Sequence, residues 1–71
     1  MKNIDYYMAL PYKMEIVEDK DEGGFVISYP DLLGCINCGE TIETAIANAN
    51  DAKKAWIKAA LESGIEIQEP N

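Results

Sequence analysis

Two cysteines and many carboxylates are the residues of this chain that are best suited to chemistry. Cys35 and Cys38 are separated by two residues, a spacing found in metal sites and in redox pairs. The chain has thirteen Asp and Glu residues and no histidine, so a nucleophile would lack its commonest general base. Ser28 and Ser63 have no identifiable base beside them. We therefore expect no catalytic residue, no metal site and no cofactor.

The two cysteines are better explained as structural thiols. A structural zinc site needs four ligands, and with no third cysteine or histidine only a site shared between molecules would be complete. In a strand, residues three apart point to opposite faces with their Cα atoms about 10 Å apart, whereas a disulfide needs less than about 7 Å. We predict that one thiol is buried and the other lies nearer the surface.

Length and charge limit the possible partners. A chain of 71 residues forms one domain over residues 1–71, and a domain this small has little stability to spare, which favours a homo-oligomer, a dimer or larger. The net charge of −7, with six lysines and no arginine, disfavours direct binding of nucleic acid. No apolar run approaches the roughly 20 residues of a membrane span, and the N-terminus lacks the pattern of a signal peptide. We expect a cytoplasmic protein that does not contact membranes.

Alternating apolar residues and glycine-rich turns predict three strands. The alternation at Tyr12–Val17 indicates a strand with one buried face. The charged segment Glu18–Gly24 ends in two glycines and is typical of a hairpin loop. Phe25–Tyr29 is the returning strand, Asp31–Gly34 is a turn, and Cys35–Cys38 is long enough for a third strand.

One long helix should follow. Thr41 is a suitable N-cap and Gly64 a suitable C-terminal cap for a helix of roughly 22 residues. Ile65–Ile67 is a candidate for a fourth strand, parallel to the first through a right-handed crossover, which gives the sheet order 3-2-1-4. The predicted fold class is α+β, a small β-β-β-α-β domain with the helix on one face of the sheet. The buried stripe of the helix is predicted at Ile42, Ala45, Ile46, Ala49, Ala52, Trp56, Ala60 and Leu61.

The aromatic residues divide into two groups. Trp56 lies on the predicted buried stripe of the helix, so we expect it in the core. Tyr6, Tyr7 and Tyr29 are candidates for a protein interface, because an amphipathic ring buries its body and keeps its hydroxyl paired there.

Taken together, several short motifs resemble the N-terminal domain of HicB-type antitoxins. They extend over nearly the whole chain and comprise Tyr6-Tyr7, Leu10-Pro11-Tyr12, Gly23-Gly24-Phe25-Val26, Tyr29-Pro30-Asp31-Leu32, Gly34-Cys35, Gly39-Glu40-Thr41 and the helix through Trp56 to Ile67 and Pro70. The chain departs from the family pattern at Leu33, where proline is usual, and at Glu43-Thr44-Ala45. The resemblance implies a three-stranded antiparallel sheet with a packed helix and an edge strand, likened to part of ribonuclease H.

The resemblance also implies a function and a partner. HicB-type antitoxins of type II toxin-antitoxin systems neutralise HicA-type toxins, small basic ribonucleases that cut messenger RNA through a histidine. On exposure and charge, we place the toxin contact at the hairpin and the following turn, at Asp19, Asp21, Glu22, Tyr29, Asp31, Leu32 and Leu33.

Two other functions remain open. One is an orphan adaptor or regulator that has lost its toxin. The other is a remnant ribonuclease H-like nuclease, which would need clustered carboxylates for two magnesium ions, whereas the first three predicted strands hold only Glu15. Family antitoxins commonly carry a C-terminal DNA-binding domain, and residues 1–71 contain none. The chain is either a naturally short member or the N-terminal part of a longer protein.

Overall fold

A single long helix organises the domain. In the computed structural model, which describes residues 2–70, helix α2 runs from Ile42 to Ser63. The Thr41 hydroxyl accepts a hydrogen bond from the Thr44 amide (3.1 Å), and Gly64 ends the helix in the left-handed conformation (φ 71°). Both caps satisfy backbone groups that a helix end leaves unpaired. The predicted helix and its two caps are confirmed.

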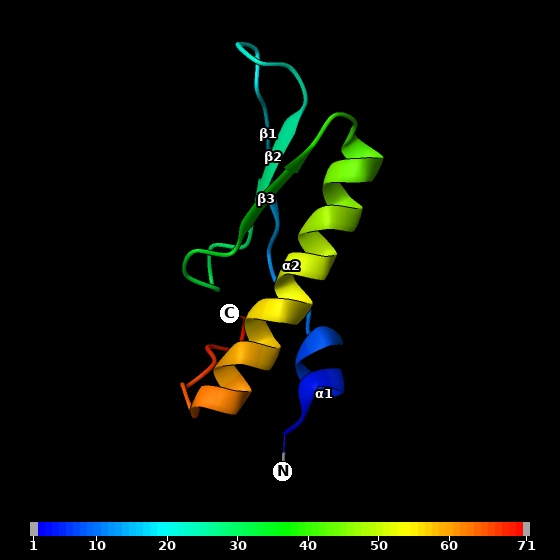
Figure 1. The fold of residues 1–71 in the computed structure, drawn as a ribbon. Coiled ribbons are helices and arrows are strands. Elements are labelled where there is room, and N and C mark those ends of the chain that lie inside the picture. The colour runs from blue at the N-terminus through cyan, green and yellow to red at the C-terminus, as the bar shows by residue number, and fades with distance from the viewer. Residues whose placement is uncertain (1, 71) are drawn as a thin grey trace.

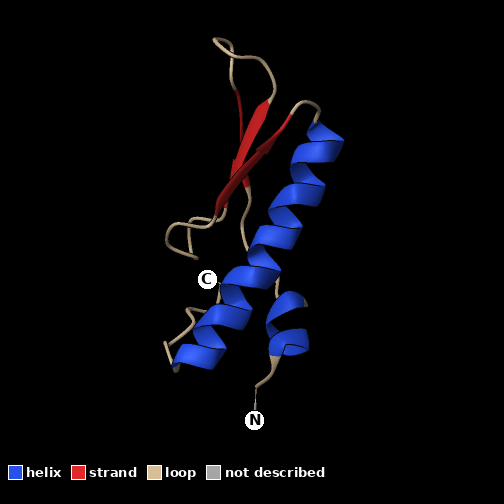
Figure 2. Ribbon diagram, viewed as in Figure 1, coloured by secondary structure: helices blue, strands red, loops and turns tan. Residues whose placement is uncertain are grey.

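Three short antiparallel strands form the sheet, in the order β1-β2-β3. They are β1 (Glu15–Glu18), β2 (Phe25–Ser28) and β3 (Ile36–Gly39), and Figure 2 shows them lying beside the first half of α2. The first strand begins three residues later than predicted. The loop between β1 and β2 has positive φ at Gly23 and Gly24, as expected for a hairpin. The predicted order of these three strands is confirmed.

The predicted fourth strand, Ile65–Ile67, is wrong. These residues form no strand in the structure. The reason is length: α2 rises about 33 Å over its 22 residues, whereas a four-residue strand spans about 13 Å. The chain therefore leaves α2 well beyond the end of the sheet, and Figure 1 shows it turning back along α2. The predicted crossover does not form within the described residues.

A short N-terminal helix, α1 (Ile4–Met8), was not predicted. The side chain of Asn3 caps it by accepting from the Tyr6 amide (3.0 Å), and α1 packs beside the second half of α2 (Figure 1). The packing buries Tyr7, which is 8% exposed. The expectation that Tyr7 and Tyr29 serve an interface is wrong, because both side chains belong to the core. Tyr6 alone of the three is exposed.

The core lies between the sheet, α1 and α2. Its most buried large side chains are Ile27, Leu32 and Ile57. The predicted helix stripe is correct at Ala45, Ala49 and Ala60, but it missed Lys53 and Ile57 and wrongly included Ile42, Ile46 and Leu61, which are exposed. The buried positions Ala45, Ala49, Lys53 and Ile57 follow one another at four-residue steps, so the buried stripe of α2 is narrower than the predicted one.

The end of β3 approaches the start of α2 very closely. A Cβ atom added to Gly39 would lie 2.5 Å from the Ala45 amide nitrogen and 2.8 Å from the Ala45 Cα. Two hydrogen bonds join the same elements: the Asn37 side chain donates to the Asn48 carbonyl (3.2 Å), and the Asn48 side chain donates to the Cys38 carbonyl (2.9 Å). Only glycine fits at this position, which sets how closely the sheet and helix pack.

Candidate functional site

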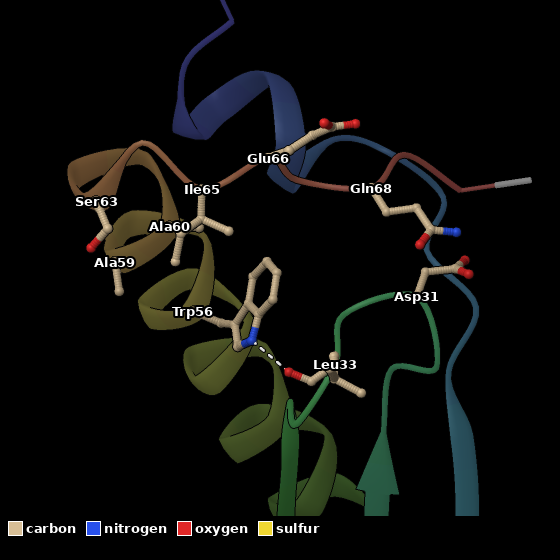
Figure 3. Close-up of a pocket in the computed structure, with 9 residues that line it drawn as sticks. All are labelled: Asp31, Leu33, Trp56, Ala59, Ala60, Ser63, Ile65, Glu66 and Gln68. Carbon is tan, nitrogen blue, oxygen red and sulfur yellow. Dashed lines mark hydrogen bonds between the residues drawn. The ribbon is translucent and has the colours of Figure 1, made fainter.

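A mostly apolar groove of about 500 Å³ lies between the second half of α2, the turn before β3 and the chain after Gly64. We call it the Trp56 groove. Figure 3 shows the Trp56 indole standing in the groove, with Ile65 on one side and the Leu33 turn on the other. Its lining residues are Asp31, Leu33, Trp56, Ala59, Ala60, Ser63, Ile65, Glu66 and Gln68. A volume of this size fits one or two large side chains, or a small ligand.

The turn that forms one wall is firmly held. The Trp56 indole Nε1 donates a hydrogen bond to the Leu33 carbonyl (2.9 Å; Figure 3). The Leu32 amide donates to the Tyr29 carbonyl and the Cys35 amide to the Leu32 carbonyl, both at 2.9 Å. The backbone of Leu33 is thus fixed from both sides, while its side chain is 89% exposed.

The opposite wall is the chain after Gly64, which is held by side-chain contacts and not by pairing with the sheet. The Tyr12 hydroxyl donates to the Gln68 carbonyl (2.7 Å), and Ile67 is buried in the core. Glu69 accepts a hydrogen bond from the Tyr6 hydroxyl (3.1 Å) and forms an ion pair with Lys2. That pairing lowers the pKa of Glu69 and raises the pKa of Lys2. The groove therefore has two fixed walls.

The acidic hairpin is a second surface, at the other end of the molecule. The sheet and its hairpin loop lie at one end of α2, and the Trp56 groove lies toward the other (Figure 1). The Asp19 carboxylate accepts hydrogen bonds within the loop, from the Asp21 amide (3.1 Å) and the Glu22 amide (3.2 Å). The side chains of Asp21 and Glu22 are exposed.

The residues predicted to contact a partner therefore fall into three places. Asp19, Asp21 and Glu22 lie in the hairpin loop, and Asp31 and Leu33 line the Trp56 groove. Tyr29 and Leu32, at 3% and 0% exposure, pack in the core and present no side-chain surface to a partner. Burial raises the pKa of the Tyr29 hydroxyl. The prediction missed Trp56 and Ile65 as lining residues, because the groove assembles from segments far apart in the sequence.

Comparison with known proteins decides the family. The sequence model of the HicB-like antitoxins of bacterial toxin-antitoxin systems matches residues 12–71. The chain belongs to the HicB-like antitoxin family. It is 36% identical over 64 residues to an uncharacterised 14.9 kDa protein from the rep-hol intergenic region of Haemophilus phage HP1, covering 90% of this chain and 45% of that protein. It is also 41% identical over 39 residues to a UPF0150 protein of Synechocystis, covering 55% of this chain and 53% of that protein. The chain thus matches about half the length of these relatives.

The cysteines of this HicB-like domain lie as predicted. Cys35 is buried and Cys38 is exposed, and both are free thiols. Burial raises the pKa of the Cys35 thiol, and the positive charge of Lys53 opposes part of that rise. Cys35 is therefore held in its neutral, unreactive form.

The carboxylates of the HicB-like domain are dispersed. Within residues 2–70, no three His, Cys, Asp or Glu side chains lie close enough to hold a metal ion. Strand β1 holds both Glu15 and Glu18, so the prediction of a single carboxylate in the strands is wrong. The two are three positions apart and point to opposite faces of the sheet. In the same part of the chain, no helix has the length and hydropathy of a membrane span.

One buried cation of the HicB-like domain was missed by sequence reasoning. Lys53 is 8% exposed, and its Nζ lies 5.2 Å from the centre of the Tyr29 ring and 5.9 Å from that of Tyr12. A cation over an aromatic face is stabilised by up to about 2 kcal/mol when water is excluded. Lys53 thus joins α2 to both tyrosines at the edge of the core.

Proposed function

We propose that this domain is an antitoxin that binds a HicA-type toxin directly and blocks its basic RNA-binding site. The family match over residues 12–71 carries the proposal. The domain acts by occupying the toxin, with no catalytic step of its own. Because the toxin would cut messenger RNA, the cytoplasm is where the pair would act.

Charge supports this partner. The domain has a net charge of −7, and a ribonuclease needs positive side chains where it holds the RNA backbone. An acidic protein competes for those same cations, and opposite charge speeds the encounter between the two proteins. The same charge repels nucleic acid, so we propose that residues 1–71 do not bind RNA or DNA themselves.

We further propose that the domain self-associates. The face of the sheet turned away from α2 exposes apolar side chains, with Val17 at 63% and Ile36 at 61%. The outer edges of β1 and β3 have unpaired backbone groups among the described residues, and such edges readily pair with another chain.

An RNA-cleavage assay tests the antitoxin proposal. A HicA-type toxin is purified and given messenger RNA, with the domain added in increasing amounts. We expect cleavage to stop near equimolar domain, and the inhibition to weaken as salt rises because charge-steered association is screened. A toxin that stays fully active with the domain in excess would refute the proposal.

The same assay examines the nuclease alternative in a lane that contains the domain alone. We expect no cleavage there. Magnesium-dependent cleavage that disappears in the Glu15→Gln variant would instead support a remnant nuclease.

A further inference from the structure

We propose that the Trp56 groove is where the toxin docks, and that it receives one large apolar side chain of the toxin flanked by a lysine or arginine. This inference rests on the proposed function and gives it a location. It assigns the main interface to the second half of α2 and the chain after Gly64. The acidic hairpin then attracts the toxin from a distance without contacting it in the complex.

The lining of the groove requires an apolar occupant. Leu33 and Ile65 are 89% and 59% exposed on its two walls, and small side chains at Ala59 and Ala60 form part of its floor. Burying one large aliphatic or aromatic side chain here removes apolar surface of both proteins from water, which favours binding.

The groove is organised before any partner arrives. The hydrogen bond from Trp56 to the Leu33 carbonyl fixes one wall, and the hydrogen bond from Tyr12 to the Gln68 carbonyl fixes the other. A site whose walls are already ordered loses little conformational entropy on binding. This explains how Leu33 stays in place although its side chain packs little against the domain.

The charges of the groove select a cationic partner. Asp31 and Glu66 are its charged lining residues, and both are acids in a domain whose net charge is −7. A lysine or arginine beside the inserted apolar side chain would pair with them. The proposed toxin is basic, so charge and apolar surface are complementary in one place.

Matched substitutions of exposed isoleucines test the apolar part of the interface. Ile65 in the groove and Ile42 at the start of α2 are the same residue type and are both exposed, at 59% and 46%, and Ile42 lies outside the groove and outside the proposed self-association face. The probe is a HicA-type toxin with its catalytic histidine replaced by alanine. We expect Ile65→Ser and Leu33→Ser to raise the dissociation rate at least about tenfold, and Ile42→Ser to leave it within twofold of the wild type. Thermal melts confirm that all three variants fold.

Matched charge substitutions test whether the groove or the hairpin contacts the bound toxin. The double variants Asp31→Asn/Glu66→Gln and Asp21→Asn/Glu22→Gln each remove two negative charges. Both should slow association similarly, because steering depends on the summed field. Only the groove variant should also speed dissociation, because its two acids pair directly with a cation of the bound toxin.

The single tryptophan provides a direct reporter. Trp56 is the one tryptophan of the chain, so 5-fluorotryptophan labelling of the domain gives one ¹⁹F resonance, from the groove itself. We expect this resonance to shift when the unlabelled toxin variant is added, and the Leu33→Ser domain to need a higher toxin concentration for the same shift.

The outcomes distinguish this inference from the proposed function. A toxin that binds the wild type and all variants equally, with no ¹⁹F shift, would overturn the groove and leave the antitoxin function standing. A toxin that fails to bind the wild type would overturn both. A dissociation rate raised by the hairpin variant and not by the groove variant would move the interface to the hairpin.

Discussion

Replacing Gly39 by alanine should destabilise the domain through a steric clash that can be read directly from the structure. The added Cβ would lie 2.5 Å from the Ala45 amide nitrogen, about 0.9 Å closer than the 3.4 Å at which ordinary van der Waals distances begin. The Ala45 Cα and the Thr44 carbonyl carbon follow at 2.8 Å. All three are backbone atoms in the first turn of α2, so no side chain can rotate away. The end of β3 and the start of α2 must separate instead.

The cost follows from what separation disrupts. Overpacking of this kind costs about 1–3 kcal/mol, and we expect the upper part of that range, because the two Asn37 and Asn48 hydrogen bonds cross the same junction. A domain of this length has about 4–11 kcal/mol of stability in total. At about 4–8 °C per kcal/mol, a loss of about 2–3 kcal/mol lowers the melting temperature by about 8–24 °C.

Thermal unfolding followed by circular dichroism measures the effect, with Gly23→Ala as the matched control. Gly23 has positive φ (84°), but a Cβ there would meet nothing within 4 Å. The control should therefore cost only the backbone strain of that conformation, about 1–2 kcal/mol. If Gly39→Ala melts at the wild-type temperature, or above Gly23→Ala, the close approach of sheet and helix is not what makes this glycine necessary.

Further predictions concern the core, the thiols, pH and assembly. Ile57→Ala should cost about 2–5 kcal/mol, measured by urea unfolding, because Ile57 is fully buried; a loss below about 1 kcal/mol would contradict this. One thiol, Cys38, should react quickly with Ellman's reagent and Cys35 only after denaturant is added, so two fast thiols would refute the assigned burial. Folding raises the pKa of the Cys35 thiol and of the Tyr29 hydroxyl, so on raising the pH the unfolded chain loses each proton before the folded domain does. The free energy of unfolding should therefore fall above about pH 8.5, where a cysteine in the unfolded chain ionises, and again above about pH 10, where a tyrosine does. Unfolding that is insensitive to pH from about 8 to about 11 would oppose this. Light scattering at about 0.15 M salt should give at least twice the mass of one chain, and the 7.9 kDa of a monomer at all concentrations would reject self-association.

Local signals explain what could be predicted from the sequence. The caps at Thr41 and Gly64 satisfy the ends of α2 within a few residues of the chain, and the hairpin glycines set the turn between β1 and β2 in the same way. Such features depend on neighbours in sequence, so a pattern alone is enough to find them.

The features that were missed depend on residues distant in sequence. A five-residue helix such as α1 is not stable by its own propensity and forms because α2 provides a surface for it. Ile65–Ile67 has the apolar alternation of a strand, but it begins too far beyond the sheet to pair. The Trp56 groove joins three separate segments, so no single stretch of sequence indicates it. Asp31 and Leu33 were found only through their charge and exposure in a turn.

The buried cation at Lys53 has a consequence for chemical modification in the cell. The other five lysines are exposed, so acetyl donors and amine-reactive labels reach them in the folded domain. Lys53 is only 8% exposed, so these reagents should reach it more slowly in the folded domain, and an acetyl group would remove the charge that rests on the two tyrosine rings. Acetylation at this position would therefore favour the opened chain, and the ratio of label at Lys53 to label at Lys54, measured by mass spectrometry, would rise with the fraction of the domain that is unfolded when the reagent is present.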